Sequence, residues 1–396
     1  MTPRKRVEAI LRGDMPDKVP LTMYECMIPQ CTAERLLRDD GMCIVYRTGV
    51  FKTHTPNVKR TSQNIQIDGV PHVRTVTETP VGAISEVSRP ADFTSWRIEM
   101  LFKKPEDYEV LKFIVQDQRF EPDYESYRRK EEELGEDFIL RAGISLTPLH
   151  QIMIGWMGVE TFAIEWAERR DEVLELNDIM TAKHREIYPI IANSPASHAN
   201  YGGNEVPEVM GIERFETYCA PLFEEAAEEM HKHGVLLGSH LDGNNKAWAH
   251  VVANSSLDYV EAFTPPPDCD LSVREALDLW PDKFLWLNFP SSVHLAPMAQ
   301  IEEATREIIQ QSAPGNRVII GITEDIPKNR WQENMLAISR VIDADTGRWL
   351  IEQVCQYPKI PVKVLYSHWE QEGKELPPLR SVYRYLTRQG YDRKAL

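Results

Sequence analysis

A short apolar run of this chain ends in side chains that could carry protons or bind a cation. The run extends from Val235 to His240 and is followed by Asp242, so an imidazole and a carboxylate stand two residues apart. Side chains at this spacing face the same side of a strand. An imidazole nitrogen beside carboxylate oxygens suits zinc or a similar divalent ion. The alternative is a metal-free site in which His240 acts as acid or base.

Other apolar runs end in the same way, with a polar side chain after the last buried position. The positions at these ends are Tyr24, Asn204, Glu205, Glu261, Asn288 and Glu324. We predict that His240, Asp242 and Glu324 bind the metal, with Glu205 or Glu261 as a further oxygen ligand or in place of Asp242. Glu205, Glu261 and His240 are the predicted proton-transfer groups. Tyr24, Asn204 and Asn288 are the predicted substrate-binding residues.

These runs must be strands that bring their ends to one place. Helical patterns separate most of the eight predicted strands, which is typical of a closed (β/α)8 TIM barrel, an α/β fold. The carboxyl ends of all strands in such a barrel surround one mouth. No G-x-G-x-x-G follows a strand, which argues against a dinucleotide-binding fold. The predicted strands are 17–25, 42–48, 138–144, 197–201, 235–240, 259–263, 284–288 and 318–322.

Two segments depart from this alternation. Residues 58–87 switch to a period of two, with an Asp68-Gly69 hairpin signal and a turn at 79–82, which predicts an antiparallel β excursion. Residues 343–396 follow the last predicted strand and helix and are rich in Pro, Tyr and charge. We therefore predict a barrel over 1–342 and a C-terminal helical extension over 343–396 that packs on the barrel or at a subunit interface.

Composition restricts the class of protein and its partners. The chain has 396 residues, 42% of them hydrophobic, and a formal net charge of -16 that is spread along the sequence. That charge argues against nucleic acid or an anionic membrane as a partner. The six cysteines form no C-x-x-C pair, and no apolar stretch reaches the length of a membrane span of about 20 residues. We expect a cytoplasmic protein with reduced thiols.

The chain resembles the uroporphyrinogen decarboxylase-like superfamily, which includes the cobalamin-dependent methyltransferases. The resemblance covers roughly residues 1–342. The segments that carry it are 2–7, 12–20, the turn at 79–82, Gly203-Asn204-Glu205, Pro221 and 238–243. It implies a TIM barrel. The segment 24–30 stands where the porphyrinogen decarboxylases carry an arginine-rich clamp, so porphyrinogen decarboxylation is not expected.

The resemblance also implies a metal site and a reaction. The methyltransferases of the superfamily hold zinc through a His-x-Cys pair and a later thiolate. His240 matches the histidine, Asp242 replaces the cysteine, and Glu324 falls near the later ligand. An oxygen-rich site is similar to that of the methoxyarene O-demethylating branch, in which cobalamin is supplied by a separate corrinoid protein.

The expected activity is therefore metal-assisted transfer of a methyl group from a small methoxylated substrate, with an aromatic ring as one option, to a corrinoid protein. The alternatives are a metal-assisted decarboxylase or lyase of the same superfamily and a non-catalytic barrel that binds a small molecule. A homodimer is one option for the assembly.

Overall fold

The computed structural model describes residues 1–91, 94–324 and 326–356, together with 362–363 and 366–367. Most of the predicted extension, 343–396, therefore lies outside the described residues, and so does Asp325 of the last predicted strand end. Helix α14 (Trp331–Gln356) runs from the predicted barrel into the beginning of that extension. The division of the chain at residue 342 and the packing of the extension stay predictions.

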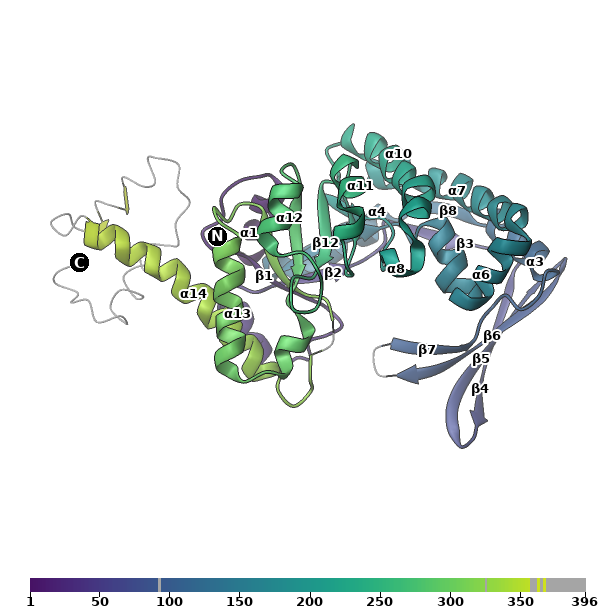
Figure 1. The fold of residues 1–396 in the computed structure, drawn as a ribbon, viewed down its shortest axis with the longest axis horizontal. Coiled ribbons are helices and arrows are strands. Elements are labelled where there is room, and N and C mark those ends of the chain that lie inside the picture. The colour runs from purple at the N-terminus through teal and green to yellow at the C-terminus, as the bar shows by residue number, and fades with distance from the viewer. Residues whose placement is uncertain (92–93, 325, 357–361, 364–365, 368–396) are drawn as a thin grey trace. The chain divides into compact units, whose positions relative to one another are not determined.

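Eight parallel strands form a closed barrel with helices between them, which confirms the predicted (β/α)8 fold. Figure 1 shows the order of the elements along the chain by colour. Around the barrel the strands follow the order β1, β14, β13, β12, β11, β10, β9 and β2. Their bounds are β1 Leu21–Tyr24, β2 Cys43–Arg47, β9 Phe138–Gly143, β10 His198–Asn200, β11 Leu236–His240, β12 Tyr259–Phe263, β13 Phe284–Asn288 and β14 Val318–Ile322.

The chain divides into two compact units. Unit 1 consists of Met1–Tyr46, Glu131–Ile139 and Tyr259–Leu396. Unit 2 consists of Arg47–Lys130 and Leu140–Asp258. Strands β1, β12, β13 and β14 belong to unit 1, and β10 and β11 belong to unit 2.

Unit 1 is organised around strands that are apolar along their whole length. β14 pairs in parallel with β1 and β13, and β13 pairs with β12. Ile319, Ile320 and Leu285 are fully buried, as expected for strands covered on both faces. The helices of this unit are α1 (Pro3–Leu11), α2 (Thr32–Asp39), η1 (Gly135–Asp137), α12 (Val273–Leu279), η5 (Ser291–Leu295), α13 (Met298–Gln311) and α14.

Unit 2 pairs β10 in parallel with β9 and β11. Most of its helices follow β9 and β10, the longest being α7, which is amphipathic and buries Leu176 and Ile191. The helices are α3 (Asp107–Gln116), α4 (Tyr124–Leu134), which continues into unit 1, α5 (Pro148–His150), η2 (Gln151–Met157), α6 (Val159–Glu168), α7 (Arg170–Ala192), α8 (Pro207–Met210), α9 (Ile212–Arg214), η3 (Phe215–Cys219), α10 (Ala220–His231), η4 (Lys246–Trp248) and α11 (Ala249–Asn254).

Two helices that the sequence predicts as regular contain π-helical segments. The helix predicted over 149–157 is a short α5 followed by the π-helix η2, and the one over 212–233 contains the π-helix η3. Such segments are rare and frequently accompany functional sites. Within the described part of the chain, no helix is both long and apolar enough to cross a membrane.

The predicted antiparallel excursion is confirmed and is larger than its sequence pattern indicates. It is a four-stranded sheet of β4 (Lys59–Ile67), β5 (Val70–Thr79), β6 (Gly82–Ala91) and β7 (Thr94–Glu99). The turns at 68–69 and 80–81 join the strands as predicted. Ile84 and Val87 of β6 are buried, and Gly82 lies against Val110 of α3. A separate ribbon pairs β3 (Phe51–His54) with β8 (Arg119–Pro122).

Candidate metal centre

All the predicted site residues except Glu261 lie at or beyond the carboxyl ends of the barrel strands, and Glu261 is the middle residue of β12 (Tyr259–Phe263). His240 is the last residue of β11, and Asp242 follows it in unit 2. Asn204 and Glu205 lie beyond β10 in the same unit. Tyr24, Glu261 and Asn288 lie in β1, β12 and β13, and Glu324 follows β14, all in unit 1.

His240 and Asp242 come together at the end of β11. The strand residues 237–239 are buried, and the side chains of His240 and Asp242 are half-buried. His240 Nε2 lies 3.6 Å from Asp242 Oδ2, which is too long for a hydrogen bond. Two ligands of one tetrahedral zinc ion, each at about 2.1 Å from it, stand roughly 3.4 Å apart. The pair therefore has a spacing that suits two ligands of the same ion.

Glu205 is held in a fixed orientation beside this pair. Its side chain is fully buried. Thr147 Oγ1 donates a hydrogen bond of 2.8 Å to one carboxylate oxygen, and the backbone N–H of Gly203 donates one of 2.7 Å to the other. The backbone N–H of Asn204 donates to the carbonyl of His240 at 2.9 Å. These contacts tie the loop after β10 to the end of β11.

Two glycines allow this loop to approach Glu205 and His240 closely. Gly202 has a φ of +75°, and a Cβ atom there would lie 2.9 Å from Glu205 Oε1. A Cβ atom on Gly203 would lie 3.3 Å from His240 Cβ. Only glycine adopts such a conformation without strain and leaves room for the carboxylate. The Gly-Gly step that precedes Asn204 therefore positions the predicted site.

Cys219 is a contact of this cluster that the sequence does not indicate. Its Sγ lies 3.4 Å from Thr147 Oγ1. Because the Thr147 hydroxyl already donates to Glu205, the thiol of Cys219 donates to Thr147. Burial raises the pKa of the Cys219 thiol, and the charge of Glu205 raises it further. Cys219 is therefore a neutral thiol that supports Glu205 through Thr147, and it is not a thiolate ligand.

His150 is a second neighbour of the cluster that sequence reasoning missed. It ends α5, and only 1% of its surface is exposed. Burial lowers the pKa of His150, and the backbone of Asn204 and the charges of Glu205 and Asp242 act in the opposite direction. The sequence offers no signal for His150, because no second ligand lies near it along the chain.

The predicted residues of unit 1 are hydrogen-bonded to their neighbours. Tyr24 Oη donates to Glu261 Oε1, and both side chains are buried. Asn288 Nδ2 donates to Thr264 Oγ1 at 3.3 Å, and Asn288 Oδ1 accepts from the backbone N–H of Thr323 at 3.0 Å. Tyr24 and Glu261 are thus brought together, and Asn288 links the ends of β12 and β14. The predicted catalytic and substrate-binding roles of these residues stay predictions.

Glu324 is exposed and lies two residues beyond β14. It belongs to unit 1, whereas His240 and Asp242 belong to unit 2. Its role as a third metal ligand stays a prediction.

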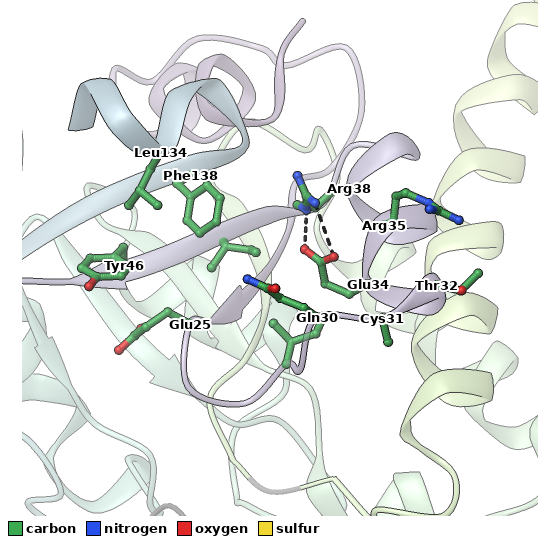
Figure 2. Close-up of a pocket in the computed structure, with 12 residues that line it drawn as sticks. Glu25, Gln30, Cys31, Thr32, Glu34, Arg35, Arg38, Tyr46, Leu134 and Phe138 are labelled. Atoms are coloured by element: carbon green, nitrogen blue, oxygen red, sulfur yellow. Dashed lines mark hydrogen bonds and ion pairs between the residues drawn. The ribbon is translucent and has the colours of Figure 1, made fainter. Parts of the chain in front are cut away.

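Unit 1 also contains a hollow between α2 and β2, with a volume of about 870 Å³ (Figure 2). Its wall carries the ion pair of Arg38 with Glu34, and Arg38 also binds Asp137 at 2.7 Å. None of the predicted catalytic or metal-binding residues is among those that line it. The lining residues are Glu25, Ile28, Gln30, Cys31, Thr32, Glu34, Arg35, Arg38, Ile44, Tyr46, Leu134 and Phe138.

Comparisons with known proteins give structural similarity alone. No protein-family model matches the chain, and no curated protein matches it. A glycoside hydrolase family 5 enzyme from Prevotella bryantii has a TM-score of 0.39 at 8% identity, over 86% of this chain and 97% of that one. A broad-specificity endoglucanase from Clostridium acetobutylicum has a TM-score of 0.36 at 9% identity, over 86% and 99%. At these scores the similarity bears on neither the reaction nor the substrate.

Proposed function

We propose that this barrel is a metal-assisted methyltransferase that moves a methyl group from a small methoxylated compound to a corrinoid protein. The observation that carries the proposal is the pair of His240 and Asp242 at the end of β11, at a separation suited to two ligands of one ion. The resemblance to the methoxyarene O-demethylating branch supports the choice of reaction. An aromatic methyl ether is the favoured substrate class within the proposal.

The donor set fits a divalent cation of borderline character. His240 offers an imidazole nitrogen, and Asp242 and Glu324 offer carboxylate oxygens. Imidazole with carboxylates suits zinc and its neighbours among the divalent metals. Such an ion, when bound, would supply a positive charge that stabilises negative charge on the ether oxygen.

The reaction balances with the corrinoid protein as the second substrate. The cob(I)alamin of that protein would attack the methyl carbon with its electron pair while the carbon–oxygen bond breaks. The bonding electrons would stay on the oxygen, which then takes up a proton to give an alcohol or phenol. Glu205 and Glu261 are the proposed proton carriers, and both are fully buried. No Asp-x-His-x-x-Gly corrinoid motif occurs in the sequence, so the corrinoid must come from a partner.

The proposed use of cob(I)alamin also indicates the cellular compartment in which the protein works. Cob(I)alamin is a strong reductant and persists only under reducing conditions. The six cysteines of the sequence include no C-x-x-C pair. We therefore propose a cytoplasmic reaction, in which reduced thiols are the rule.

The test combines metal analysis with a direct assay of methyl transfer. Purified protein loaded with zinc is incubated with a panel of methoxylated aromatic compounds and free cob(I)alamin, and formation of methylcobalamin is followed by its visible spectrum. His240→Ala should remove the metal and slow transfer by about a hundredfold or more. The exposed His233→Ala is the matched control and should behave as the unmodified protein.

Three other outcomes would replace the proposal. Release of carbon dioxide from carboxylated compounds without methyl transfer would identify a decarboxylase or lyase. Binding of a panel compound without turnover would identify a non-catalytic barrel. Methyl transfer that survives complete removal of metal by a chelator would exclude the metal from the reaction and leave His240 as an acid or base.

A further inference from the structure

The four-stranded excursion of unit 2 has two edges that are built differently (Figure 1). β7, at one edge, has six residues, its register with β6 shifts at residues 87–88, and its Arg97 donates to the carbonyl of Gly155 in η2. β4, at the other edge, has nine residues in unbroken register with β5. Bulges and short strands protect a sheet edge from pairing with another chain. Within the described residues, β7 has both protections, and β4 pairs with β5 alone.

The sequence of β4 also lacks the residues that usually protect an edge strand. Lys59 and Arg60 begin the strand, but residues 61–67 contain no charge and no proline. Most of its side chains are exposed. Thr61 and Ile65 are β-branched, which favours pairing in a sheet. A long, regular and uncharged edge of this kind is ready to pair with another strand.

The hairpin turn determines which backbone groups of β4 face outward. Asp68 and Gly69 both have positive φ, of 51° and 76°, as in a two-residue type I′ turn. Such a turn closes on a hydrogen-bonded pair, which here is Ile67 and Val70. Because the bonding direction alternates along an antiparallel strand, every second residue of β4 presents its N–H and C=O away from β5. These residues are Arg60, Ser62, Asn64 and Gln66.

We propose that β4 pairs antiparallel with β4 of a second copy of this chain, across a two-fold axis at Gln63. Both four-stranded sheets then join into one continuous sheet. In this register Ser62 faces the partner's Asn64, and Arg60 faces the partner's Gln66. These outward-facing residues exchange two backbone hydrogen bonds per pair, about eight bonds over the interface. The inference does not depend on the proposed reaction.

The side chains and the charge of β4 fit a second copy in this register. Thr61 faces the partner's Ile65, and cross-strand pairs of β-branched residues stabilise a sheet. Lys59 faces the partner's Ile67, so no like charges stand opposite each other. Residues 58–99 contain five Lys or Arg and five Asp or Glu, whereas the whole chain has a net charge of -16. The excursion is therefore a neutral region of an acidic protein, where two copies repel each other least.

Sedimentation velocity of the full chain over a range of concentrations tests the pairing. The unmodified protein should form a dimer. Gln63→Lys brings two like charges together at the axis and should raise the dissociation constant of the dimer at least about tenfold. Ala83→Lys adds the same charge at an exposed position of the inner strand β6 and should leave the constant unchanged. A monomer at all concentrations, or a dimer that Gln63→Lys leaves unaffected, would overturn the inference.

Cysteine cross-linking tests the register. Opposed residues of a non-hydrogen-bonded pair have Cα atoms about 4.5 Å apart, which a disulfide can span. Gln63→Cys should therefore give a covalent dimer when diamide is added as the oxidant. Gln66→Cys is the matched control, because its two copies would stand roughly 20 Å apart along the strands and should cross-link no more than the unmodified protein. Equal cross-linking of the two variants would overturn the inference.

Discussion

The polar strand ends of the two units are built differently. In unit 1 the predicted site side chains bond to one another: Tyr24 donates to Glu261, and Asn288 bridges Thr264 and Thr323. In unit 2 the ends carry His240 and Asp242 at 3.6 Å, which is beyond hydrogen-bond distance. Both sets lie where a TIM barrel places its chemistry.

The two sets also differ in the backbone around them. In unit 2, a loop with two glycines packs closely against Glu205 and His240. Buried polar side chains that bond to one another, as in unit 1, make a structure rigid. Within the proposed function, His240 and Asp242 of unit 2 bind the metal, whereas Tyr24 and Asn288 of unit 1 shape the substrate site and Glu261 carries a proton.

The largest expected effect concerns the close packing around Glu205. Gly202→Ala places a Cβ atom 2.9 Å from Glu205 Oε1 and 3.2 Å from Thr147 Cγ2, at a φ of +75°. Strain of the left-handed backbone costs about 1–2 kcal/mol and crowding in a packed interior about 1–3 kcal/mol more. We expect the free energy of unfolding in urea to fall by about 4 kcal/mol.

Gly234→Ala separates the two causes. Gly234 has a φ of +74° in the same unit, and a Cβ atom there would meet nothing within 4 Å. Only the backbone strain of about 1–2 kcal/mol should remain. If Gly202→Ala and Gly234→Ala lowered the free energy of unfolding equally, the loop would not be packed tightly around Glu205. The contrast between the two units would then be weaker.

A smaller effect should appear on acidification and should be shared by both units. Burial lowers the pKa of His184 in unit 2 and of His294 in unit 1, each to about 4. Because the folded pKa lies below that of the unfolded chain, about 6.5, the folded state binds fewer protons between these values. Each group therefore contributes stability that is complete above pH 6.5 and is lost as the pH falls through about 4.

The expected loss is about 3 kcal/mol for each histidine over that interval. Urea unfolding at pH 7, 5.5 and 4 should show a weaker pH dependence in His184→Gln and in His294→Gln. The exposed His233→Gln should keep the pH dependence of the unmodified chain. If only one of the two variants showed a weaker pH dependence of the free energy of unfolding, the buried histidine of only one unit would contribute to the loss of stability in acid.

The fold could be predicted from the sequence because its signals are local. The predicted strands 259–263, 284–288 and 318–322 coincide with β12, β13 and β14. Strands buried on both faces read as continuous apolar runs, which is the signal that sequence reasoning used. The excursion was predicted only to residue 87, although β7 ends at Glu99. The π-helical segments carry no period that separates them from ordinary helices.

The site could be predicted only where its residues follow a strand. His240, Asp242 and Glu205 stand directly after apolar runs, so the topology alone places them at the rim. His150 and Cys219 reach this region through helices and tertiary contacts with Thr147 and Glu205. Neither has a partner nearby in the sequence. Such residues become visible only when burial and hydrogen bonding are known.

The smallest effect tests whether the hydrogen-bonded pair of Tyr24 and Glu261 lies outside the metal centre. Tyr24→Phe removes the hydroxyl that donates to the buried Glu261 carboxylate and should cost about 2 kcal/mol of unfolding free energy, because hydrogen bonds to charged groups are worth about 1.5–3 kcal/mol. Tyr127→Phe is the matched control, since its buried hydroxyl donates to the neutral carbonyl of Leu140 and should cost about 1 kcal/mol. Zinc affinity should be the same in both variants. If Tyr24→Phe weakened zinc binding as strongly as His240→Ala, the bonded side chains of unit 1 would belong to the metal centre, and the contrast between the two rims would be wrong.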